Sequence, residues 1–460
     1  MLFPTVTFAL FFAVVLPVSW ALQPHQRAWR AWILVASYVF YGWWDWRFVF
    51  LLGASTIVNH VLAVAIHRTR PRAARKALLA LALVCDLGLL GYFKYTNFFL
   101  SSVDNAVGTS WIANVVLPVG ISFYTFMAIS YVVDTYRGVL VPASFARFAV
   151  FQAFFPHLVA GPIVRASELL PQLESPRDPR RVDVSRALFL IVSGLFLKVV
   201  IANHLATHIV DDVFAAPNRH SSLEVLIGVY GYAVQIFADF CGYTNIAIGV
   251  ALLLGFEFPQ NFNSPYTAVS LQDFWRRWHM TLSRWLRDYL YISLGGNRKG
   301  RLLTYRNLLL TMVLGGLWHG AAWTFVAWGA IHGGGLAIER ALGWRPTSVA
   351  AQWFGRILTF HVVCFGWIFF RADSFGRAGA VLERLFTAWG QSSPLVTTSV
   401  LVAIAVGIGT QYVRPGALAG LLRGFGRLPM PAQAVTVAVC LMLINTLGPE
   451  GVAPFIYFRF

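Results

Sequence analysis

Long apolar runs separated by short polar segments dominate the pattern of this chain. The apolar positions are continuous and do not alternate, which excludes a membrane β-barrel and favours membrane-spanning α-helices. Several runs are shorter than the roughly 20 residues that a crossing needs, so we expect some re-entrant or half helices. The pattern predicts an all-α polytopic protein with about 11–13 transmembrane and re-entrant helices. The candidate spans are Phe3–Trp20, Trp32–Val49, Leu51–Ile66, Ala77–Tyr92, Val115–Val133, Ala149–Val164, Ala187–Ile201, Leu223–Phe240, Ile246–Phe256, Leu308–Gly335, Ile357–Phe370, Val396–Gly409 and Ala434–Leu447.

Composition and charge agree with a membrane protein. Of 460 residues, 58% are hydrophobic and 12% are charged, and the mean hydropathy is +0.64, a balance that soluble proteins do not show. The net charge of +17 comes from arginines in short loops, at Arg68–Lys76, Arg177–Arg186 and Arg276–Arg306. By the positive-inside rule such loops face the cytoplasm. The positive charge is therefore explained by membrane topology, and we expect the protein to contact a lipid bilayer and no nucleic acid. Without long polar stretches, residues 1–460 are predicted to form a single membrane domain.

Signatures of metals and bound cofactors are missing from the sequence. The four cysteines lie scattered in apolar segments and form no metal-ligand or disulfide pattern. There is no Walker A sequence, no HExxH motif and no GxSxG motif. We therefore expect no metal site and no bound cofactor.

The dipeptide Trp318–His319 stands inside the apolar run Leu308–Gly335. If a helix enters the membrane near Asn307, His319 lies roughly 15–18 Å along it, near the middle of a bilayer core. An ionisable side chain at that depth is costly, and histidine is the side chain best suited to move protons near neutral pH. A catalytic His319 with Trp318 shaping its wall is one interpretation, and a buried histidine bonded to a backbone carbonyl is the other.

The segment Leu271–Tyr291 has the pattern of an amphipathic helix at the cytoplasmic interface. His279 shares its apolar stripe and is expected to face the protein interior. Arginines beside aromatic rings can hold a phosphorylated, adenine-bearing ligand, although an ordinary anchor helix would have the same pattern. The candidate donor-binding residues of this segment are Trp275, Arg276, Arg277, Trp278, Trp285 and Arg287.

Polar residues at Asp239–Asn245 interrupt the apolar run between Leu223 and Phe256. This pattern indicates either a broken helix that lines a cavity, with Asp239 contacting substrate, or a polar network at a helix end. Lys198 adjoins an apolar run and is expected to reach towards an interface. The segment Phe155–Arg165 carries two prolines and predicts a re-entrant turn, in which a structural role for His157 is favoured.

Together these residues resemble the membrane-bound O-acyltransferase (MBOAT) family, and most of all its bacterial branch that O-acetylates alginate and related exopolysaccharides. The resemblance runs over most of the chain, with a motif-bearing core at about 115–372. Its matching stretches are Tyr41–Trp46, Gly91–Tyr95, Gly120–Phe126, Phe155–Ile163, Asn261–Tyr266, Phe274–Ser283, Trp285–Arg298, Gly316–Gly320 and Phe370–Ala372.

The resemblance implies a ring of helices around a central funnel in a bacterial inner membrane. It implies that His319 is the central catalytic histidine and that His279 acts nearer the cytoplasm. The expected donor is a cytoplasmic thioester, acetyl-CoA, and the expected acceptor is an extracytoplasmic polysaccharide. An extracytoplasmic acyltransferase partner would receive the acetyl group.

Other functions remain open at this point. Within the enzymes, D-alanyl transfer to teichoic acid and peptidoglycan O-acetylation are the alternatives. Outside them are a polysaccharide or lipid-linked sugar transporter and a scaffold of an acetylation complex. A transporter would need internal repeats, which the sequence does not show. A scaffold would have no need for an ionisable side chain such as His319 inside the bilayer.

Overall fold

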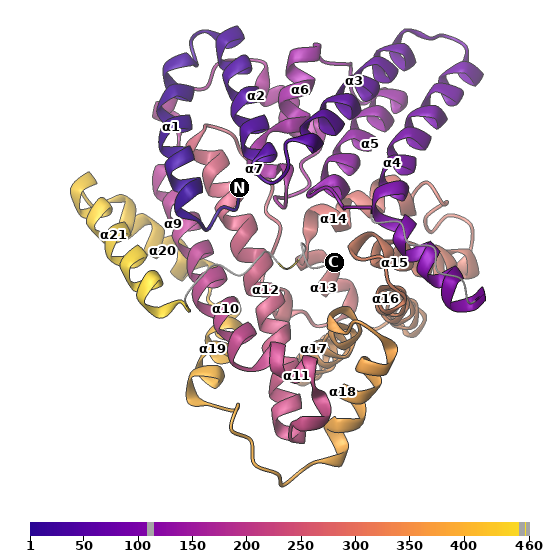
Figure 1. Cartoon of the computed structure of the whole chain (residues 1–460), viewed down its shortest axis with the longest axis vertical. Coiled ribbons are helices and arrows are strands. Elements are labelled where there is room, and N and C mark those ends of the chain that lie inside the picture. The colour runs from indigo at the N-terminus through magenta and orange to yellow at the C-terminus, as the bar shows by residue number, and fades with distance from the viewer. Residues whose placement is uncertain (108–114, 450–455, 457–460) are drawn as a thin grey trace. The chain divides into compact units, whose positions relative to one another are not determined.

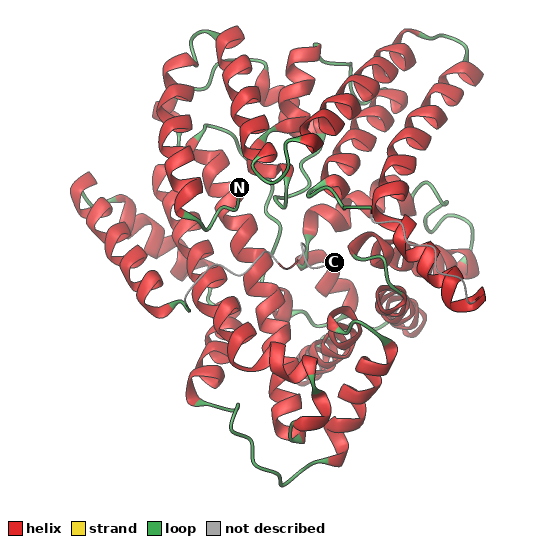
Figure 2. Ribbon diagram, viewed as in Figure 1, coloured by secondary structure: helices red, strands yellow, loops and turns green. Residues whose placement is uncertain are grey.

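The structure, a computed structural model, describes residues 1–107, 115–449 and 456 of the chain. Every regular element in these described residues is helical, and Figure 2 shows helices joined by loops. This confirms the all-α prediction. The α-helices are α1 (Val6–Leu22), α2 (Gln26–Gly42), α3 (Arg47–Arg68), α4 (Arg72–Val107), α5 (Ile121–Arg137), α6 (Phe145–Ala153), α7 (Phe155–Leu158), α8 (Ala166–Leu169), α9 (Val184–Leu195), α10 (Asn203–Leu205), α11 (Asp211–Ala215), α12 (Ser222–Leu253), α13 (Leu271–Arg277), α14 (Met280–Trp285), α15 (Arg301–His319), α16 (Trp323–Leu342), α17 (Val349–Arg371), α18 (Phe375–Thr387), α19 (Thr398–Gly409), α20 (Pro415–Gly426) and α21 (Met430–Leu447).

Shorter helical turns connect several of these elements. Three of them are π-helical: η3 (Phe196–Ala202), η4 (Ala206–Val210) and η7 (Leu286–Tyr291). The 3₁₀ turns are η1 (Leu170–Leu173), η2 (Pro179–Arg181), η5 (Pro217–Arg219), η6 (Pro265–Thr267) and η8 (Thr410–Tyr412). Because η3 and η4 follow α9 without a gap, Val184–Ala215 forms one long apolar helix with π-helical turns in it.

Six helices in the described part of the chain are long and apolar enough to cross a membrane, so the protein is a multi-pass membrane protein. A bent pair, Thr398–Tyr412 with Gly416–Gly426, makes seven if its halves count as one span. Other apolar runs form shorter or less apolar helices, such as α1, which is why the count of full spans is lower than that of all predicted segments. The six are Arg47–Arg68, Arg72–Val103, Val184–Ala215, Ser222–Leu253, Val349–Arg371 and Met430–Leu447.

The chain divides into two compact units, each discontinuous in sequence. The first comprises residues 1–187 and 247–259. Within it, α3, α4 and α5 contribute Ile66, Ala82 and Val132 to one buried apolar cluster. Another cluster joins α1, α2 and α7, where the Phe40 and Phe155 rings lie 5.5 Å apart and both pack on Phe8. The prediction of one membrane domain over the whole chain stays a prediction.

The second unit comprises residues 188–246 and 260–460, and it contains the histidines predicted to be catalytic. Its helices α15 and α16 form a hairpin joined by residues 320–322, and α17 packs against α16 (Figure 1). The apolar run Leu308–Gly335 is therefore two helices with a sharp turn between them. This corrects the single span expected there.

Helix α12 runs without a break from Ser222 to Leu253, so both interpretations of Asp239–Asn245, a broken helix and a helix end, were wrong. Gly242 serves packing there. A Cβ atom at this position would lie 2.6 Å from the carbonyl oxygen of Gly194 and 3.0 Å from the backbone nitrogen of Lys198. Only a residue without a side chain allows two helices to approach so closely.

Candidate active site

His279 lies in a break between two short helices. Helix α13 ends at Arg277 and α14 begins at Met280, and His279 has a φ of +40° in the left-handed region. The segment Leu271–Tyr291 is thus not the continuous amphipathic helix that its pattern predicts. Backbone pairing with a distant segment replaces the helical bonds, because Met280 donates to the Asn261 carbonyl (2.9 Å) and Asn263 donates to the Arg277 carbonyl (2.9 Å). Left-handed backbone at a residue other than glycine is costly and concentrates at functional sites.

Asn261 fixes the tautomer of His279. Its Oδ1 accepts from the backbone N–H of Thr281 at 3.2 Å, so this atom is the oxygen of the amide. The same Oδ1 lies 3.0 Å from Nδ1 of His279, which must therefore be the donor. In the neutral ring Nε2 then carries the lone pair, and it has no hydrogen-bond partner within the described residues.

Burial keeps the imidazole of His279 neutral. The side chain is fully buried, and burial lowers its pKa to about 3 because a charged ring would lose its hydration. At neutral pH His279 therefore offers an unprotonated Nε2, which can accept a hydrogen bond, on a ring that Asn261 holds from its other side. A lowered pKa makes this ring a weak base, so the arrangement suits orientation of a bound group better than proton abstraction.

His319 is the last residue of α15, directly before the hairpin turn. At Gly316 a Cβ atom would collide with the backbone carbonyl of Phe325, and at Gly329 with that of Met312, so these glycines allow α15 and α16 to pack closely. The C-terminal end of a helix carries partial negative charge on its free carbonyls. That charge stabilises a histidine which accepts a proton.

The structure brings the two predicted catalytic histidines together. Their ring centroids lie 6.4 Å apart, and both side chains are buried, with His319 3% exposed. Aromatic rings surround them: Trp318 is 5.0 Å from His319 and Phe240 is 4.7 Å from His279. On its other sides His319 contacts Trp328 at 5.1 Å and Phe370 at 5.4 Å. An enclosed apolar wall of this kind excludes bulk water from the histidine pair.

Two residues near the site were missed by sequence reasoning, Asn261 and His332. His332 is fully buried on α16, and its Nδ1 accepts from the indole N–H of Trp275 at 3.3 Å. Its ring lies 4.9 Å from that of Trp328, which also contacts His319. The spacing of Trp328 and His332, one helical turn apart in an apolar run, was the signal available for His332. Asn261 gave no such signal, because its role depends on a contact across the fold.

The predicted donor-binding residues occupy different environments. Trp278 is buried and stacks on Phe274 at 5.5 Å, and Trp285 is buried beside Tyr289. The arginines lie outward: Arg277 pairs with Asp273 (2.8 Å), Arg287 pairs with Asp288 (2.6 Å), and Arg276 is exposed. Trp275 is half-buried, and its indole N–H donates a hydrogen bond to His332. Donor binding by these residues stays a prediction.

Asp239 forms a buried ion pair with Lys198 of η3. Its second oxygen accepts from the backbone N–H of Ile456 at 3.0 Å. Lys198 is 1% exposed, so it does not reach towards an interface as expected. The reason is that a buried carboxylate on α12 supplies the partner that an interface would otherwise provide. Substrate contact by Asp239 stays a prediction.

His157 belongs to the first unit. It is fully buried, Nε2 donates to the carbonyl of Phe151 at 2.8 Å, and the ring stacks on Phe258 at 5.3 Å. Within Phe155–Arg165 regular helix ends at Leu158 and resumes at Ala166, and the re-entrant turn stays a prediction. These contacts favour the structural role. Among the residues that the structure describes, no group of three or more His, Cys, Asp or Glu side chains could hold a metal ion.

Comparison with known proteins identifies the family of this helical arrangement. The model of the MBOAT, membrane-bound O-acyltransferase family matches residues 77–372, a range that includes Asn261, His279 and His319. The chain belongs to the membrane-bound O-acyltransferase family. It is an O-acyltransferase, and the transporter and scaffold alternatives give way to this assignment.

Similar proteins of known name cover most of the chain. It is 39% identical to a probable alginate O-acetylase of Azotobacter vinelandii, over 93% of this chain and 94% of the relative. It is 41% identical to a probable alginate O-acetylase of Pseudomonas aeruginosa, over 92% and 82%. It is 38% identical to a peptidoglycan O-acetyltransferase of Helicobacter pylori, over 77% and 73%.

Proposed function

We propose that this O-acyltransferase moves an acetyl group from a cytoplasmic thioester, acetyl-CoA, across the bacterial inner membrane for O-acetylation of an extracytoplasmic polysaccharide such as alginate. The observation that carries the proposal is the buried pair His279–His319, with ring centroids 6.4 Å apart, in a chain of this family. The similarity to the two probable alginate O-acetylases supports the acetyl group and the polysaccharide acceptor.

His319 acts as the general base in this proposal. Acetyl transfer needs the acceptor hydroxyl to lose its proton as its oxygen attacks the thioester carbonyl carbon. A C–O bond forms and the C–S bond breaks. The hydroxyl proton passes to His319 and from there to the leaving thiolate, which becomes the free thiol and leaves His319 neutral again. The position of His319 at the C-terminal end of α15 supports this role, because the helix dipole favours the protonated ring.

His279 acts on the donor side. Its Nε2 lone pair, set by the bond from Nδ1 to Asn261, can accept a hydrogen bond from the donor or assist in moving a proton. The aromatic wall around both histidines limits hydrolysis of the thioester by water.

The acceptor has a second candidate. The relative from Helicobacter pylori is a peptidoglycan O-acetyltransferase, so peptidoglycan is an alternative acceptor for this chain. D-alanyl transfer to teichoic acid is a further alternative, and it would require an acylated carrier protein as donor. Purified protein together with its extracytoplasmic partner, offered acetyl-CoA or an aminoacylated carrier protein with each polymer in turn, separates these reactions.

The variant His319→Ala tests the role of His319. Loss of a general base should lower the transfer rate by about 10²–10⁴-fold while the protein still inserts and folds. Transfer of radiolabelled acetyl groups by membranes of matched protein content is the measurement. His208→Ala, an exposed histidine of the same unit, is the control and should keep full activity. Near wild-type transfer by His319→Ala would refute the proposal.

The variant His279→Ala tests the donor-side role of His279. The acetyl-CoA concentration that gives the half-maximal transfer rate should be higher for His279→Ala than for the wild type. His319→Ala should stay inactive even at saturating acetyl-CoA. Titration of acetyl-CoA with variants of equal melting temperature gives both values. An unchanged rate and an unchanged donor dependence would show that His279 only braces the chain.

A further inference from the structure

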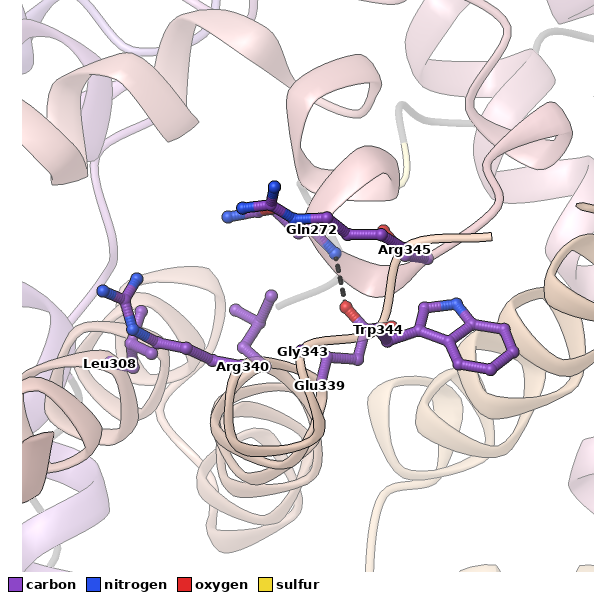
Figure 3. A pocket seen from close by; sticks show the side chains of 9 residues that line it. Gln272, Leu308, Glu339, Arg340, Gly343, Trp344 and Arg345 are labelled. Atoms are coloured by element: carbon purple, nitrogen blue, oxygen red, sulfur yellow. Dashed lines mark hydrogen bonds between the residues drawn. The ribbon is translucent and has the colours of Figure 1, made fainter. Parts of the chain in front are cut away.

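A pocket of ≈340 Å³ opens where the end of α16 meets the start of α13 (Figure 3). All of its lining residues belong to the second unit. Its polar and charged lining residues include Gln272, Glu339, Arg340 and Arg345, and Leu308 of α15 and Trp344 also line it. Neither His279 nor His319 is among the residues that line this pocket.

Among the described residues, Glu339 forms no ion pair with the arginines of this pocket. Its Oε1 accepts from the backbone N–H of Leu271 at 2.6 Å and its Oε2 accepts from that of Gln272 at 3.0 Å. Both carboxylate oxygens are therefore engaged by the first turn of α13, where backbone N–H groups have no helical partner. The carboxylate holds α13 in place and completes the pocket floor.

Trp344 holds the chain that carries Arg345. Its indole N–H donates to the carbonyl of Val269 at 3.2 Å, and its ring lies 6.1 Å from that of Phe354. The preceding Gly343 has a φ of +63°, which ends α16 and turns the chain back over the pocket. Arg345 is thus presented from a braced turn and Arg340 from the last turn of α16.

Arg340 and Arg345 form no ion pair with any carboxylate in the described residues, and both are exposed. Figure 3 shows their guanidinium groups extending to the same side of the pocket, whereas the ring of Trp344 extends to the other side. Both arginines and Gln272 line this one pocket, and its volume is large enough for a phosphorylated group. Guanidinium forks match phosphate oxygens in geometry and charge.

We propose that this pocket binds a phosphate group of a ligand through Arg340 and Arg345. One source is the phosphorylated headgroup of the thioester donor, an assignment that rests on the proposed function. The pocket residue Leu308 and His319 share α15, about 16 Å apart at a rise of about 1.5 Å per residue, so one extended ligand can reach from the pocket towards the histidines. The other source is the phosphate of an anionic lipid headgroup.

The double variant Arg340→Gln/Arg345→Gln tests phosphate binding. Coenzyme A is titrated into purified full-length protein in a neutral detergent by calorimetry, without an acceptor, so that binding is measured apart from turnover. Loss of two charge-assisted contacts should weaken binding at least tenfold. The matched control is Arg423→Gln/Arg427→Gln, which removes two exposed arginines from the end of α20 and should leave the affinity unchanged. Inorganic pyrophosphate should compete with coenzyme A on the wild type and not on the pocket variant.

A second arm identifies the lipid source. Wild type and pocket variant are placed in phosphatidylcholine nanodiscs with and without phosphatidylglycerol, and bound phosphatidylglycerol is counted by native mass spectrometry. Loss of bound phosphatidylglycerol with unchanged coenzyme A binding assigns the pocket to a lipid, and loss of coenzyme A binding assigns it to the donor. The proposal is overturned if the pocket variant, with an unchanged melting temperature, binds coenzyme A within twofold of the wild type and keeps its phosphatidylglycerol. Failure of acetyl transfer alone would count against the proposed function and not against the pocket.

Discussion

At the scale of the residue, the chemistry of the site depends on which nitrogen of His279 carries its proton. Asn261 decides this, because its Oδ1 accepts from Nδ1 of His279, from the Thr281 hydroxyl at 2.8 Å and from the Thr281 backbone N–H. Three donors on one oxygen leave no alternative orientation of the amide. The buried Asn261 thereby acts as a positioning residue that orients the ring of His279 through a hydrogen bond.

Asn261→Ala should lower the rate of acetyl transfer about tenfold or more, because the ring of His279 would lose its orienting partner and could adopt the other tautomer. Thr281→Val is the matched comparison, since it removes one donor to the same Oδ1 and leaves the bond to His279 in place. Initial rates and melting temperatures of both variants are measured together. Equal losses of rate at equal losses of stability would reduce Asn261 to a structural role.

At the scale of the element, the close packing of α15 against α16 sets the position of His319. Gly333 and Gly334 illustrate how specific this packing is, because they are neighbours on α16 with opposite surroundings. A Cβ atom at Gly333 would lie 2.9 Å from Cα of Leu309, whereas a Cβ atom at Gly334 would have no heavy atom within 4 Å. The glycines facing α15 are therefore needed for approach, and the others are not.

Gly333→Ala should destabilise the protein relative to Gly334→Ala by about 1–3 kcal/mol, since the first must push two helices apart and the second only fills open space. Both substitutions gain the same helix propensity, so their difference isolates the packing. Gly333→Ala should also lower acetyl transfer, because α15 carries His319 at its end. The measurement is thermal unfolding in detergent beside initial rates. Similar behaviour of the two variants would contradict the importance of this contact.

At the scale of the whole molecule, the described chain is a set of helices with apolar surfaces that suit a bilayer. A long polysaccharide outside the membrane needs a surface that holds it, and we propose that an extracytoplasmic acyltransferase partner provides this surface and receives the acetyl group. The membrane protein would then supply activated acetyl groups and the partner would place them on the polymer.

Liposomes containing only this protein and supplied with acetyl-CoA on the cytoplasmic side should therefore fail to acetylate polymer on the other side to completion. Addition of the partner should restore polymer acetylation, and His319→Ala with the partner should not. Mass spectrometry of the recovered polymer gives the degree of acetylation. Full acetylation by this protein alone would refute the need for a partner.

The sequence predicted the helical class because that class depends on local properties, whereas the prediction that His279 and His319 are catalytic came from the resemblance to the family. Continuous apolar runs determine membrane helices, since hydrogen bonds within each helix satisfy the backbone in lipid. A histidine in an apolar run is costly wherever the run lies, so the run itself made His319 a candidate. The same local reasoning went wrong at Leu308–Gly335 and at Asp239–Asn245. There, close contacts at Gly316 and Gly242 decided between a turn, a break and a continuous helix.

Only the tertiary structure decided the rest, because it rests on contacts between residues far apart in the chain. The break at His279 exists because residues 261–263 take the backbone bonds of residues 277–280, and its tautomer follows from Asn261. Lys198 likewise pairs with Asp239, which is distant in the sequence, and so does not reach the interface as expected. Periodicity along a sequence records which face of an element is buried, but it does not record which partner lies opposite that face, and the partner determines the chemistry of a buried polar group.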